Sequence, residues 1–249
     1  MNCALIGYTG FVGSNLLSSQ KWSALINSTN INDYSGESFD YALIAVGDAR
    51  KWLANKCGAL DQDHILNIFF ALERMSFKKI DLITTVDVYG DNYVDSDSIN
   101  EESIIFSNEP YGLNRLLLEN LIVREFKNVQ IFRLPGLVGK GLKKNLIFDL
   151  VNKREDFLKN YHPESRFQYV DLSLLGSFIK NIGFSEGRVV NFVSEPLSVE
   201  EIGGVFGFDY SHFNKSAKVI KYNVRTKFNS DGYFYNKADV LKMLRSYAR

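Results

Sequence analysis

A glycine-rich turn near the N-terminus constrains the fold of this chain more strongly than any other feature. It has the spacing Gly7-x-x-Gly10-x-x-Gly13, it follows the short apolar run 1–6, and a helical pattern begins at Ser14. In such a turn Gly7 permits a tight bend, Gly10 lets a ligand come close to the backbone, and Gly13 lets the helix pack on the strand. A strand that leads through such a turn into a helix can hold a pyrophosphate on backbone N–H groups. We therefore predict a dinucleotide site made by Gly7, Thr9, Gly10, Phe11, Val12 and Gly13.

The sequence after this turn alternates between short apolar runs and helical patterns. Strands are expected at residues 24–26, 39–47, 79–85, 129–134 and 188–193. Helices are expected at 111–126, at 172–182 and around an apolar face made by Ile65, Ile68, Phe69 and Leu72. This alternation predicts right-handed crossovers and an α/β fold, a Rossmann-type doubly wound parallel sheet.

The pattern is looser in the C-terminal half, where we expect a small substrate cap. It contains helical patterns at 146–157 and 237–247 and a short apolar run at 167–170. We predict that 1–135 and 168–193 form the dinucleotide-binding Rossmann domain and that 136–167 and 194–249 form the substrate-binding cap. Ligands in such sheets bind at the C-terminal ends of the strands, so the cap is expected to cover that edge.

Composition excludes several other classes of protein. Lys and Arg number 29 and Asp and Glu also number 29, so the chain lacks the one-sided charge that recruits nucleic acid or an anionic membrane. The two cysteines and three histidines show no metal-ligand, disulfide or catalytic-triad spacing. The glycine turn begins too early for a signal peptide and no apolar run is long enough to span a membrane, so we expect a cytoplasmic protein.

The sequence leaves the choice between NAD and NADP open. Such folds usually carry an acidic residue after the second strand to hold the adenosine ribose. Here that strand ends in Asn27 and Ser28, the first acid is Asp33, and no Arg or Lys is placed to meet a 2′-phosphate. Other cofactor contacts are expected where later strands end, at Ala45, Val46, Gly47 and Leu134.

Further stretches, in order along the chain, match motifs of one known family. Thr84–Gly90 resembles Ser-Ser-x-x-Val-Tyr-Gly, Pro110–Arg115 followed by Glu119 resembles Pro-Tyr-x-x-Ser-Lys…Glu, and Arg133–Gly139 resembles Arg-x-x-x-Val-Tyr-Gly. Two later landmarks are matched by Phe167–Asp171 and Asn191–Ser194. With the glycine turn, the chain resembles the extended short-chain dehydrogenase/reductases, which include nucleotide-sugar epimerases, dehydratases and ketoreductases. The resemblance implies an NAD or NADP cofactor and a nucleotide sugar as substrate, in the synthesis of surface-polysaccharide sugars.

The resemblance also implies a catalytic group. Tyr111 stands where the family has its general acid or base, and Thr85 where it has the hydroxyl that bonds the same substrate oxygen. The family's Lys, which lowers the pKa of the Tyr and holds the nicotinamide ribose, is replaced by Arg115. Arginine keeps the positive charge and the donors but does not readily release a proton, so activation of Tyr111 is expected to survive and a proton relay is not. An exposed ion pair between Arg115 and Glu119 is the alternative.

Four other residues are weaker candidates. Asp87 matches the second acid of the family's dehydratases, while Val86 replaces the first, and this favours epimerisation or ketone reduction over dehydration. Asp87 and Lys51 are expected near the substrate, although a strand-end Asp or a solvated loop Lys would also explain them. Asn145 stands where relatives hold the sugar nucleotide's phosphates, and Asn67 resembles the Asn of the family's fourth helix.

Three functions remain open at this stage. The first is an NAD(P)-dependent oxidoreductase that reduces or epimerises a nucleotide sugar, and the presence of both Tyr111 and Thr85 favours it. Arg115 motivates the second, a non-catalytic dinucleotide sensor. The third is an isomerase or mutase of a nucleotide sugar on the same fold. The leucines of the helix that begins at Tyr111 suggest a homodimer.

Overall fold

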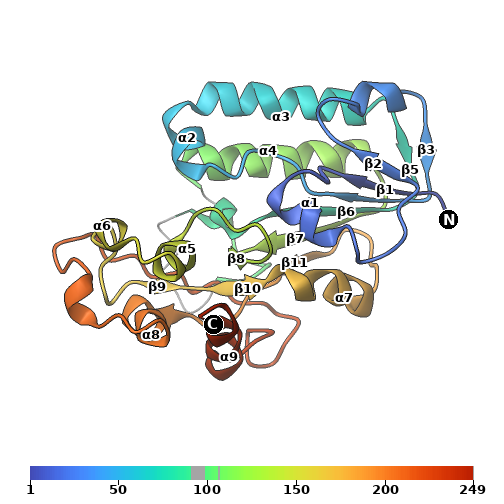
Figure 1. Cartoon of the computed structure of the whole chain (residues 1–249). Coiled ribbons are helices and arrows are strands. Elements are labelled where there is room, and N and C mark those ends of the chain that lie inside the picture. The colour runs from blue at the N-terminus through green and yellow to red at the C-terminus, as the bar shows by residue number, and fades with distance from the viewer. Residues whose placement is uncertain (91–98, 106, 249) are drawn as a thin grey trace. The chain divides into compact units, whose positions relative to one another are not determined.

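Figure 1 shows the computed structural model, which describes residues 1–90, 99–105 and 107–248. The chain divides into two compact units. Within the described residues, the first unit holds 1–90, 104–134 and 172–190, and the second holds 99–103, 135–171 and 191–248. The sequence-based domain boundaries had given 99–103, 135, 168–171 and 191–193 to the Rossmann domain.

The first unit is built on a six-stranded sheet in the order β11-β7-β6-β4-β1-β2. Its strands are β1 (Cys3–Ile6), β2 (Ala24–Ile26), β4 (Tyr41–Ile44), β6 (Ile80–Thr85), β7 (Val129–Leu134) and β11 (Val189–Asn191). The pairs β1–β2, β1–β4, β4–β6 and β6–β7 are all parallel. Every residue of β1, β6 and β7 is buried, as expected for parallel strands covered on both faces. The predicted Rossmann-type parallel sheet is confirmed.

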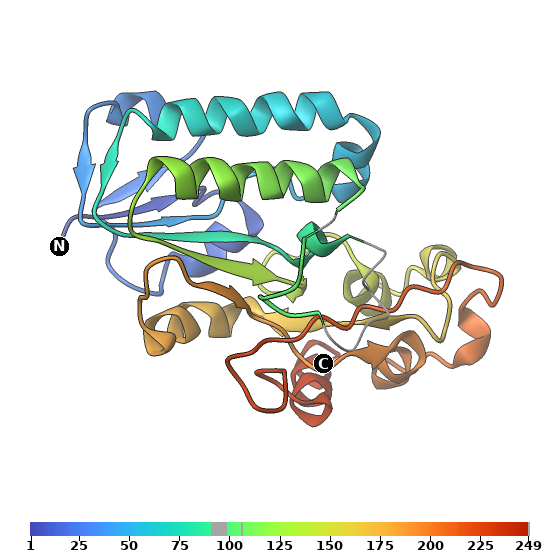
Figure 2. The same cartoon turned by 180° about the vertical axis from the view of Figure 1, so that it is seen from behind.

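Helices cover both faces of this sheet (Figures 1 and 2). On one face α3 (Gly58–Leu72) packs beside α4 (Pro110–Glu125), and on the other α1 (Phe11–Leu16) packs beside α7 (Leu172–Ile182). Apolar side chains of α3 and α4, among them Ile65 and Leu118, join strand residues such as Ile6 in one core. The shorter elements are α2 (Lys51–Lys56), the 3-10 helices η1 (Ile31–Tyr34) and η2 (Val86–Tyr89), and the paired strands β3 (Ser38–Phe39) and β5 (Ser76–Phe77).

The strand order creates a switch point between β1 and β4. From β1 the chain moves to β2 on one side, and it then returns past β1 to β4 on the other side. In open α/β sheets such a reversal leaves a crevice at the carboxyl ends of the two strands, and ligands bind there. The residues that follow Ile6 and Ile44 therefore lie where a cofactor is expected.

The second unit contains two small sheets and four helices among its described residues. Its strands are β8 (Gly136–Val138), parallel to β10 (Tyr169–Asp171), and β9 (Arg166–Phe167), antiparallel to β12 (Leu197–Ser198). Its helices are α5 (Leu146–Val151), α6 (Glu155–Leu158), α8 (Val199–Val205) and α9 (Lys237–Tyr247), with the 3-10 helix η4 (Tyr210–His212). The buried carboxamide of Gln168 joins distant segments, because it donates to the carbonyls of Ser194 and Val224 and accepts from the Val224 N–H.

Three predicted elements are each interrupted in the structure. The run 39–47 is divided at Asp40, whose carboxylate accepts from the Asn2 N–H and pairs with Lys78, and β4 ends at Ile44. The helix predicted at 146–157 is broken where Lys153 takes a positive φ of 51°, outside the helical region. The strand predicted at 167–170 is divided at Gln168. Through the described residues, the helices are all too short or too polar to cross a bilayer.

Candidate dinucleotide and catalytic site

Two of the three glycines in the N-terminal turn are required by packing. Gly7 has a φ of +89°, and a Cβ added there would lie 2.1 Å from the Ala45 carbonyl oxygen at the end of β4. A Cβ on Gly13 would lie 2.2 Å from the Gly7 carbonyl oxygen. Both distances are far below contact distance, so only glycine fits. The turn that leaves β1 is therefore closed directly against the loop that follows β4.

Gly10 differs from its two neighbours in the motif. It is exposed, its φ is −72°, and an added Cβ would have only the Gly7 carbonyl oxygen within 4 Å, at 3.3 Å. Neither packing nor backbone conformation requires glycine here, so the absence of a side chain leaves open space beside the backbone. This fits close approach of a pyrophosphate. Because α1 has only 6 residues, backbone N–H groups of the turn matter more here than a helix dipole.

The end of β2 offers little to a ribose. The Asn27 side-chain oxygen accepts from the N–H and hydroxyl of Thr29 and from the Asn30 N–H, and its amide donates to the Tyr8 hydroxyl at 3.3 Å. The carboxamide of Asn27 is thus engaged in holding its own turn. Ser28 is exposed beside it.

The loop after β4 contacts both the glycine turn and α4. Ala45 donates its N–H to the Ile6 carbonyl at 2.8 Å, and Val46 follows it half-buried. Gly47 has a φ of +99°, and a Cβ there would lie 3.0 Å from the Arg115 guanidinium carbon. Leu134, at the end of β7, is buried and pairs in register with Thr85. The candidate cofactor residues of the first unit thus lie along one edge of its sheet.

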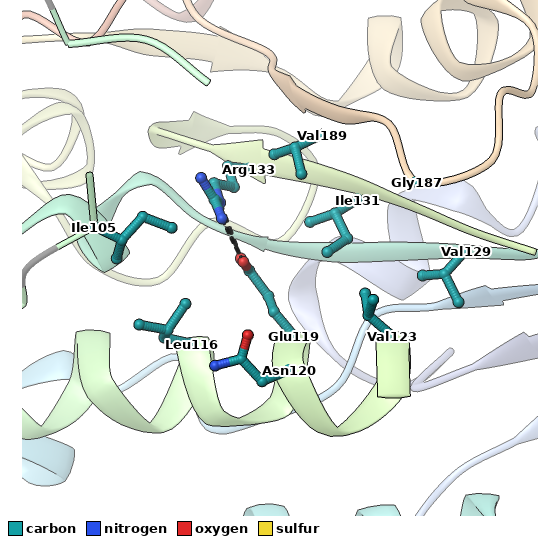
Figure 3. A pocket seen from close by; sticks show the side chains of 10 residues that line it. All are labelled: Ile105, Leu116, Glu119, Asn120, Val123, Val129, Ile131, Arg133, Gly187 and Val189. Atoms are coloured by element: carbon teal, nitrogen blue, oxygen red, sulfur yellow. Dashed lines mark hydrogen bonds and ion pairs between the residues drawn. The ribbon is translucent and has the colours of Figure 1, made fainter. Parts of the chain in front are cut away.

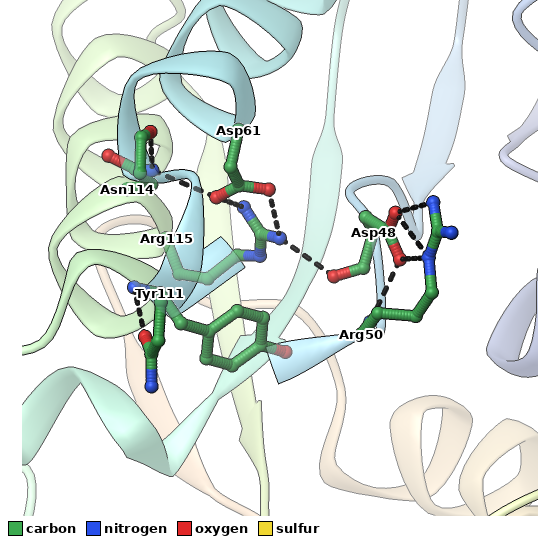
Figure 4. Close-up of polar contacts among 8 residues, drawn as sticks. Asp48, Arg50, Asp61, Tyr111, Asn114 and Arg115 are labelled. Carbon is green, nitrogen blue, oxygen red and sulfur yellow. Dashed lines mark hydrogen bonds and ion pairs between the residues drawn. The ribbon is translucent and has the colours of Figure 1, made fainter. Parts of the chain in front are cut away.

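Arg115 lies in a buried ion pair, which Figure 4 shows from close by. Its two terminal nitrogens donate to the two carboxylate oxygens of Asp61 at 3.2 and 3.1 Å, and one of them also donates to the Asp48 carbonyl at 2.9 Å. Both charged side chains are almost fully buried, at 4% and 5% exposed. Asn114 donates to the same carboxylate at 2.9 Å. The alternative of an exposed Arg115–Glu119 pair is wrong, since both residues are buried and have other partners.

Tyr111 lies against this pair. The Arg115 guanidinium carbon is 4.6 Å from the centre of the Tyr111 ring, and the Tyr111 N–H donates to the side-chain oxygen of Asn55 at 2.9 Å. Burial raises the pKa of the Tyr111 phenol above its ordinary value, and Asp87 raises it further, while Arg115 and Lys51 lower it only in part. The sequence predicted activation by Arg115. Its charge does act in that direction, but the net shift of the pKa is upward.

Thr85, Asp87 and Lys51 form a connected polar cluster at the end of β6. The Thr85 hydroxyl donates to one Asp87 carboxylate oxygen at 3.0 Å and accepts from the Asp87 N–H at 3.1 Å. The other Asp87 oxygen accepts from the Lys51 ammonium at 2.8 Å. The alternative of a solvated loop Lys is not what the structure shows, because Lys51 is the first residue of α2. The structure thus brings together three of the predicted catalytic and substrate residues.

Glu119 belongs to a second buried network, beneath the ends of β6 and β7. Its carboxylate accepts from the Arg133 guanidinium at 2.5 and 3.1 Å and from the Thr84 hydroxyl at 2.6 Å, and Arg133 also donates to the Tyr89 hydroxyl at 2.9 Å. Figure 3 shows this pair beside a cavity of about 190 Å³. The described residues that line the cavity include none of the predicted site residues. The network fixes α4 to the strand that carries Thr85.

Asn145 lies in the second unit, where it caps a helix. Its side-chain oxygen accepts from the Phe148 N–H at 3.1 Å at the start of α5, and its amide donates to the Leu137 carbonyl at 2.9 Å. Asn145 has a φ of 116°, which is rare outside glycine. Its predicted contact with a sugar nucleotide stays a prediction.

Sequence reasoning missed Asp61 and Asn55. It named Asn67 on α3 instead, but Asn67 is exposed. A signal for Asp61 was present, because Asp61 shares the face of the helix that carries Ile65 and Phe69, and a carboxylate on such a face needs a buried partner. In the part of the chain that the structure describes, no group of three or more His, Cys, Asp or Glu residues could hold a metal ion.

Solved structures of nucleotide-sugar enzymes share this fold over nearly their whole length. A UDP-glucose 4-epimerase from Thermotoga maritima, crystallised with UDP-glucose, is 16% identical with a TM-score of 0.73, covering 100% of this chain and 97% of that one. The dTDP-glucose 4,6-dehydratase DesIV from Streptomyces venezuelae, with NAD bound, is 15% identical with a TM-score of 0.76, covering 99% and 97%. RMD from Pseudomonas aeruginosa, complexed with NADPH, is 18% identical with a TM-score of 0.72, covering 100% and 99%.

Similarity at this level of identity shows a common fold. No protein-family model matches the chain, and no curated protein matches it in sequence. The predicted resemblance to the extended short-chain dehydrogenase/reductases is thus confirmed at the level of the fold.

Proposed function

We propose that this protein is an NAD(P)-dependent oxidoreductase or epimerase that acts on a nucleotide-activated sugar. One observation carries the proposal: the glycine turn and the helix with Tyr111 meet on the same loop. Gly7 packs on Ala45, and Arg115 packs on Gly47 in that loop, which follows β4 at the switch point of the sheet. A dinucleotide and a phenol that exchanges a proton with its substrate would need such proximity.

The residues of the turn and of the β4 loop would hold the dinucleotide. Gly10 offers open space beside its backbone, and residues 45–47 border the turn. When bound, the dinucleotide would accept or supply the hydride. Structurally similar proteins crystallised with NAD or NADPH support this choice of cofactor.

Reduction of a 4-keto sugar is the first candidate reaction. A phenol whose pKa lies above its ordinary value stays protonated at neutral pH, so Tyr111 is ready to donate a proton to the oxygen of a ketone. Thr85 would donate to the same oxygen once its hydroxyl turns away from the Asp87 carboxylate that accepts from it in this structure. Epimerisation by transient oxidation is the second candidate, supported by the similar structures of 4-epimerases.

The ligands of structurally similar proteins support a nucleotide sugar as the class of substrate. Structures with UDP-glucose, UDP-N-acetylmuramic acid or UDP support a nucleotide sugar, for which Lys51 and Asn145 are the candidate contacts. A role in making sugars for surface polysaccharides is part of this proposal.

Two measurements test the proposed function. Native mass spectrometry of the purified protein should detect a bound dinucleotide. Cofactor oxidation should then be measured with a panel of nucleotide 4-keto sugars, and epimer formation with the corresponding nucleotide sugars. Consumption of reduced cofactor would identify a reductase, and product without net consumption an epimerase. Dinucleotide binding without turnover of any panel member would instead support a sensor, and a ring-contracted product a mutase.

We further propose a homodimer that uses the helices α3 and α4. Both helices carry large apolar side chains that are exposed in the single chain, among them Leu60, Phe70, Leu113 and Val123. Light scattering at micromolar concentration should give twice the mass of the chain, and Val123→Glu should lower it to that of a monomer.

A further inference from the structure

Arg115 cannot return a proton to Tyr111. Its terminal nitrogens are committed to Asp61 and to the Asp48 carbonyl, and both charges of the pair are buried. A guanidinium also keeps its proton at any ordinary pH. A phenol that gives up its proton in each turnover must recover one. The site therefore needs a different group with a transferable proton.

Lys51 is placed to be that group. Its ammonium lies 2.8 Å from Asp87 and 3.4 Å from Glu109, which face it from η2 and from the residue before α4. Its side chain is 35% exposed, so it can exchange protons with water. Arg115 and Tyr111 are the other ionisable groups contributed by α4 to this site.

A neighbouring residue on α2 fixes this helix against the start of α4, which carries Tyr111. Asn55 lies one helical turn after Lys51, on the same face of the helix. Its side chain accepts from the Tyr111 N–H at 2.9 Å and donates to Glu109 at 2.7 Å. These two contacts join α2 to the start of α4. The electrostatic effect of Lys51 on the phenol has the same direction as that of Arg115.

We propose that Lys51 supplies the transferable proton of the site, the role that the Arg115 guanidinium has lost to its pairing with Asp61. This inference rests on the proposed function. A bound reduced dinucleotide would supply the hydride for the carbonyl carbon. Tyr111 would give the proton of its O–H bond to the carbonyl oxygen and become a phenolate. The phenolate then takes a proton that the Lys51 ammonium releases, through a water molecule. The Lys51 amine recovers a proton from solvent, so each turnover takes up one proton and oxidises one dinucleotide.

In this scheme Lys51 acts only through Tyr111, by returning a proton to the phenolate, so it is a positioning residue. Asp87 holds its ammonium, and Thr85 in turn holds Asp87.

The test compares kcat and dinucleotide affinity in the parent, Lys51→Met and Lys51→Arg. Lys56→Met is the matched control, because Lys56 is exposed at the other end of α2. We expect Lys51→Met to lose at least about 100-fold in kcat with unchanged dinucleotide affinity, the lower end of the range for general acid–base groups. Added methylammonium should restore part of this loss, and Lys51→Arg should not, because arginine keeps the charge without a transferable proton.

Each other outcome overturns the inference. Parent-like kcat in Lys51→Met or full turnover in Lys51→Arg would show that no proton from Lys51 is needed. A loss that methylammonium does not restore would show a structural role only. An inactive parent would instead contradict the proposed function, which separates the two failures.

A second readout needs no turnover. In the protein without cofactor, acetylation of Lys51 by a limiting acylating reagent should be slower than that of Lys56, as measured by mass spectrometry. Asp87→Asn should speed labelling of Lys51 and leave Lys56 unchanged. Equal labelling of Lys51 with and without Asp87 would contradict the ion pair on which the inference depends.

Discussion

Two basic residues, Arg115 and Lys51, act electrostatically on the Tyr111 phenol, and their ion pairs differ in how far they are buried. The pair Arg115–Asp61 is 4% and 5% exposed, whereas the pair Lys51–Asp87 is 35% and 19% exposed. A buried ion pair is costly to break, so Arg115 serves to hold α3, α4 and the β4 loop together. A half-exposed pair is held weakly and can exchange protons with water. The buried Arg115 charge therefore serves the structure, whereas the half-exposed Lys51 ammonium is the group that the proposed reaction uses.

The largest loss of turnover is expected at Tyr111, on whose phenol both basic residues act. Tyr111→Phe removes the hydroxyl and keeps the ring that packs on Arg115. Turnover should fall by ~10²–10⁴-fold, the usual contribution of a general acid, while dinucleotide affinity stays nearly unchanged. The measurement is kcat with the true substrate, beside a fluorescence titration of the dinucleotide. Parent-like turnover would exclude Tyr111 as the proton donor.

Breaking the buried pair should cost stability as well as function. Arg115→Met leaves Asp61 buried without its cation, so we expect a loss of about 3–5 kcal/mol in the free energy of unfolding. Dinucleotide binding and turnover should fall together, because Arg115 also holds the Asp48 carbonyl of the β4 loop. Denaturant titration measures the first effect. Arg115→Lys, which keeps a cation, should remain folded and active, and an equal loss there would contradict this explanation.

Asp81 in β6 is a buried carboxylate like Asp61, but its partner is a phenol and not a cation. It accepts from the Tyr41 hydroxyl at 2.8 Å, and burial raises its pKa from 3.8 to about 6. The folded state then binds the proton more tightly than the unfolded state. The stability from this group is therefore full below pH 3.8 and is lost as the pH rises through about 6.

Asp81→Asn should remove this pH dependence. The difference in unfolding free energy between variant and parent should change in favour of the variant by up to about 3 kcal/mol between pH 4 and 7. Denaturant titrations of both proteins across that range provide the measurement. Parallel pH profiles would show that Asp81 titrates in the folded protein as it does in the unfolded chain.

The smallest effect is expected at the end of β2, where the described residues form no charged pair. Asn27 is engaged in its own turn and Ser28 is exposed, so neither a carboxylate nor a guanidinium selects the 2′ position of the ribose there. Affinities for NAD and NADP should lie within about tenfold, or about 1.4 kcal/mol. Calorimetric titration with both would refute this if only one of them bound.

The local sequence was sufficient to predict most of the sheet. The strands at 24–26 and 129–134 and the helices at 172–182 and 237–247 have the predicted bounds, because each is a continuous apolar or periodic run. Breaks at Asp40 and Lys153 were missed, since each depends on a contact or a backbone angle that periodicity does not reveal. The short helix α2 was also missed.

The site was less predictable, because its partners come from distant segments. Motif order was enough to propose Tyr111, Thr85 and Arg115 as site residues, but it gave no sign that Arg115 pairs with Asp61, 54 residues earlier in the chain. The contact of Lys51 with Asp87 likewise joins positions 36 residues apart. Pairing at such separations follows from the packing of α2 and α3 against α4 and not from any local pattern.

The proposed function depends on a dinucleotide held by the turn at Gly7–Gly13, and Gly10→Val is the sharpest test of that site. The added side chain would fill the open space beside the Gly10 backbone without a backbone clash closer than 3.3 Å at its Cβ, so the fold should persist. Gly204→Val in α8 is the control, since an added Cβ there meets nothing within 4 Å. We predict that NAD(P)H fluorescence enhancement is lost in Gly10→Val and kept in Gly204→Val, with unchanged melting temperatures. Undiminished enhancement in Gly10→Val would exclude the Gly7–Gly13 turn as the dinucleotide site.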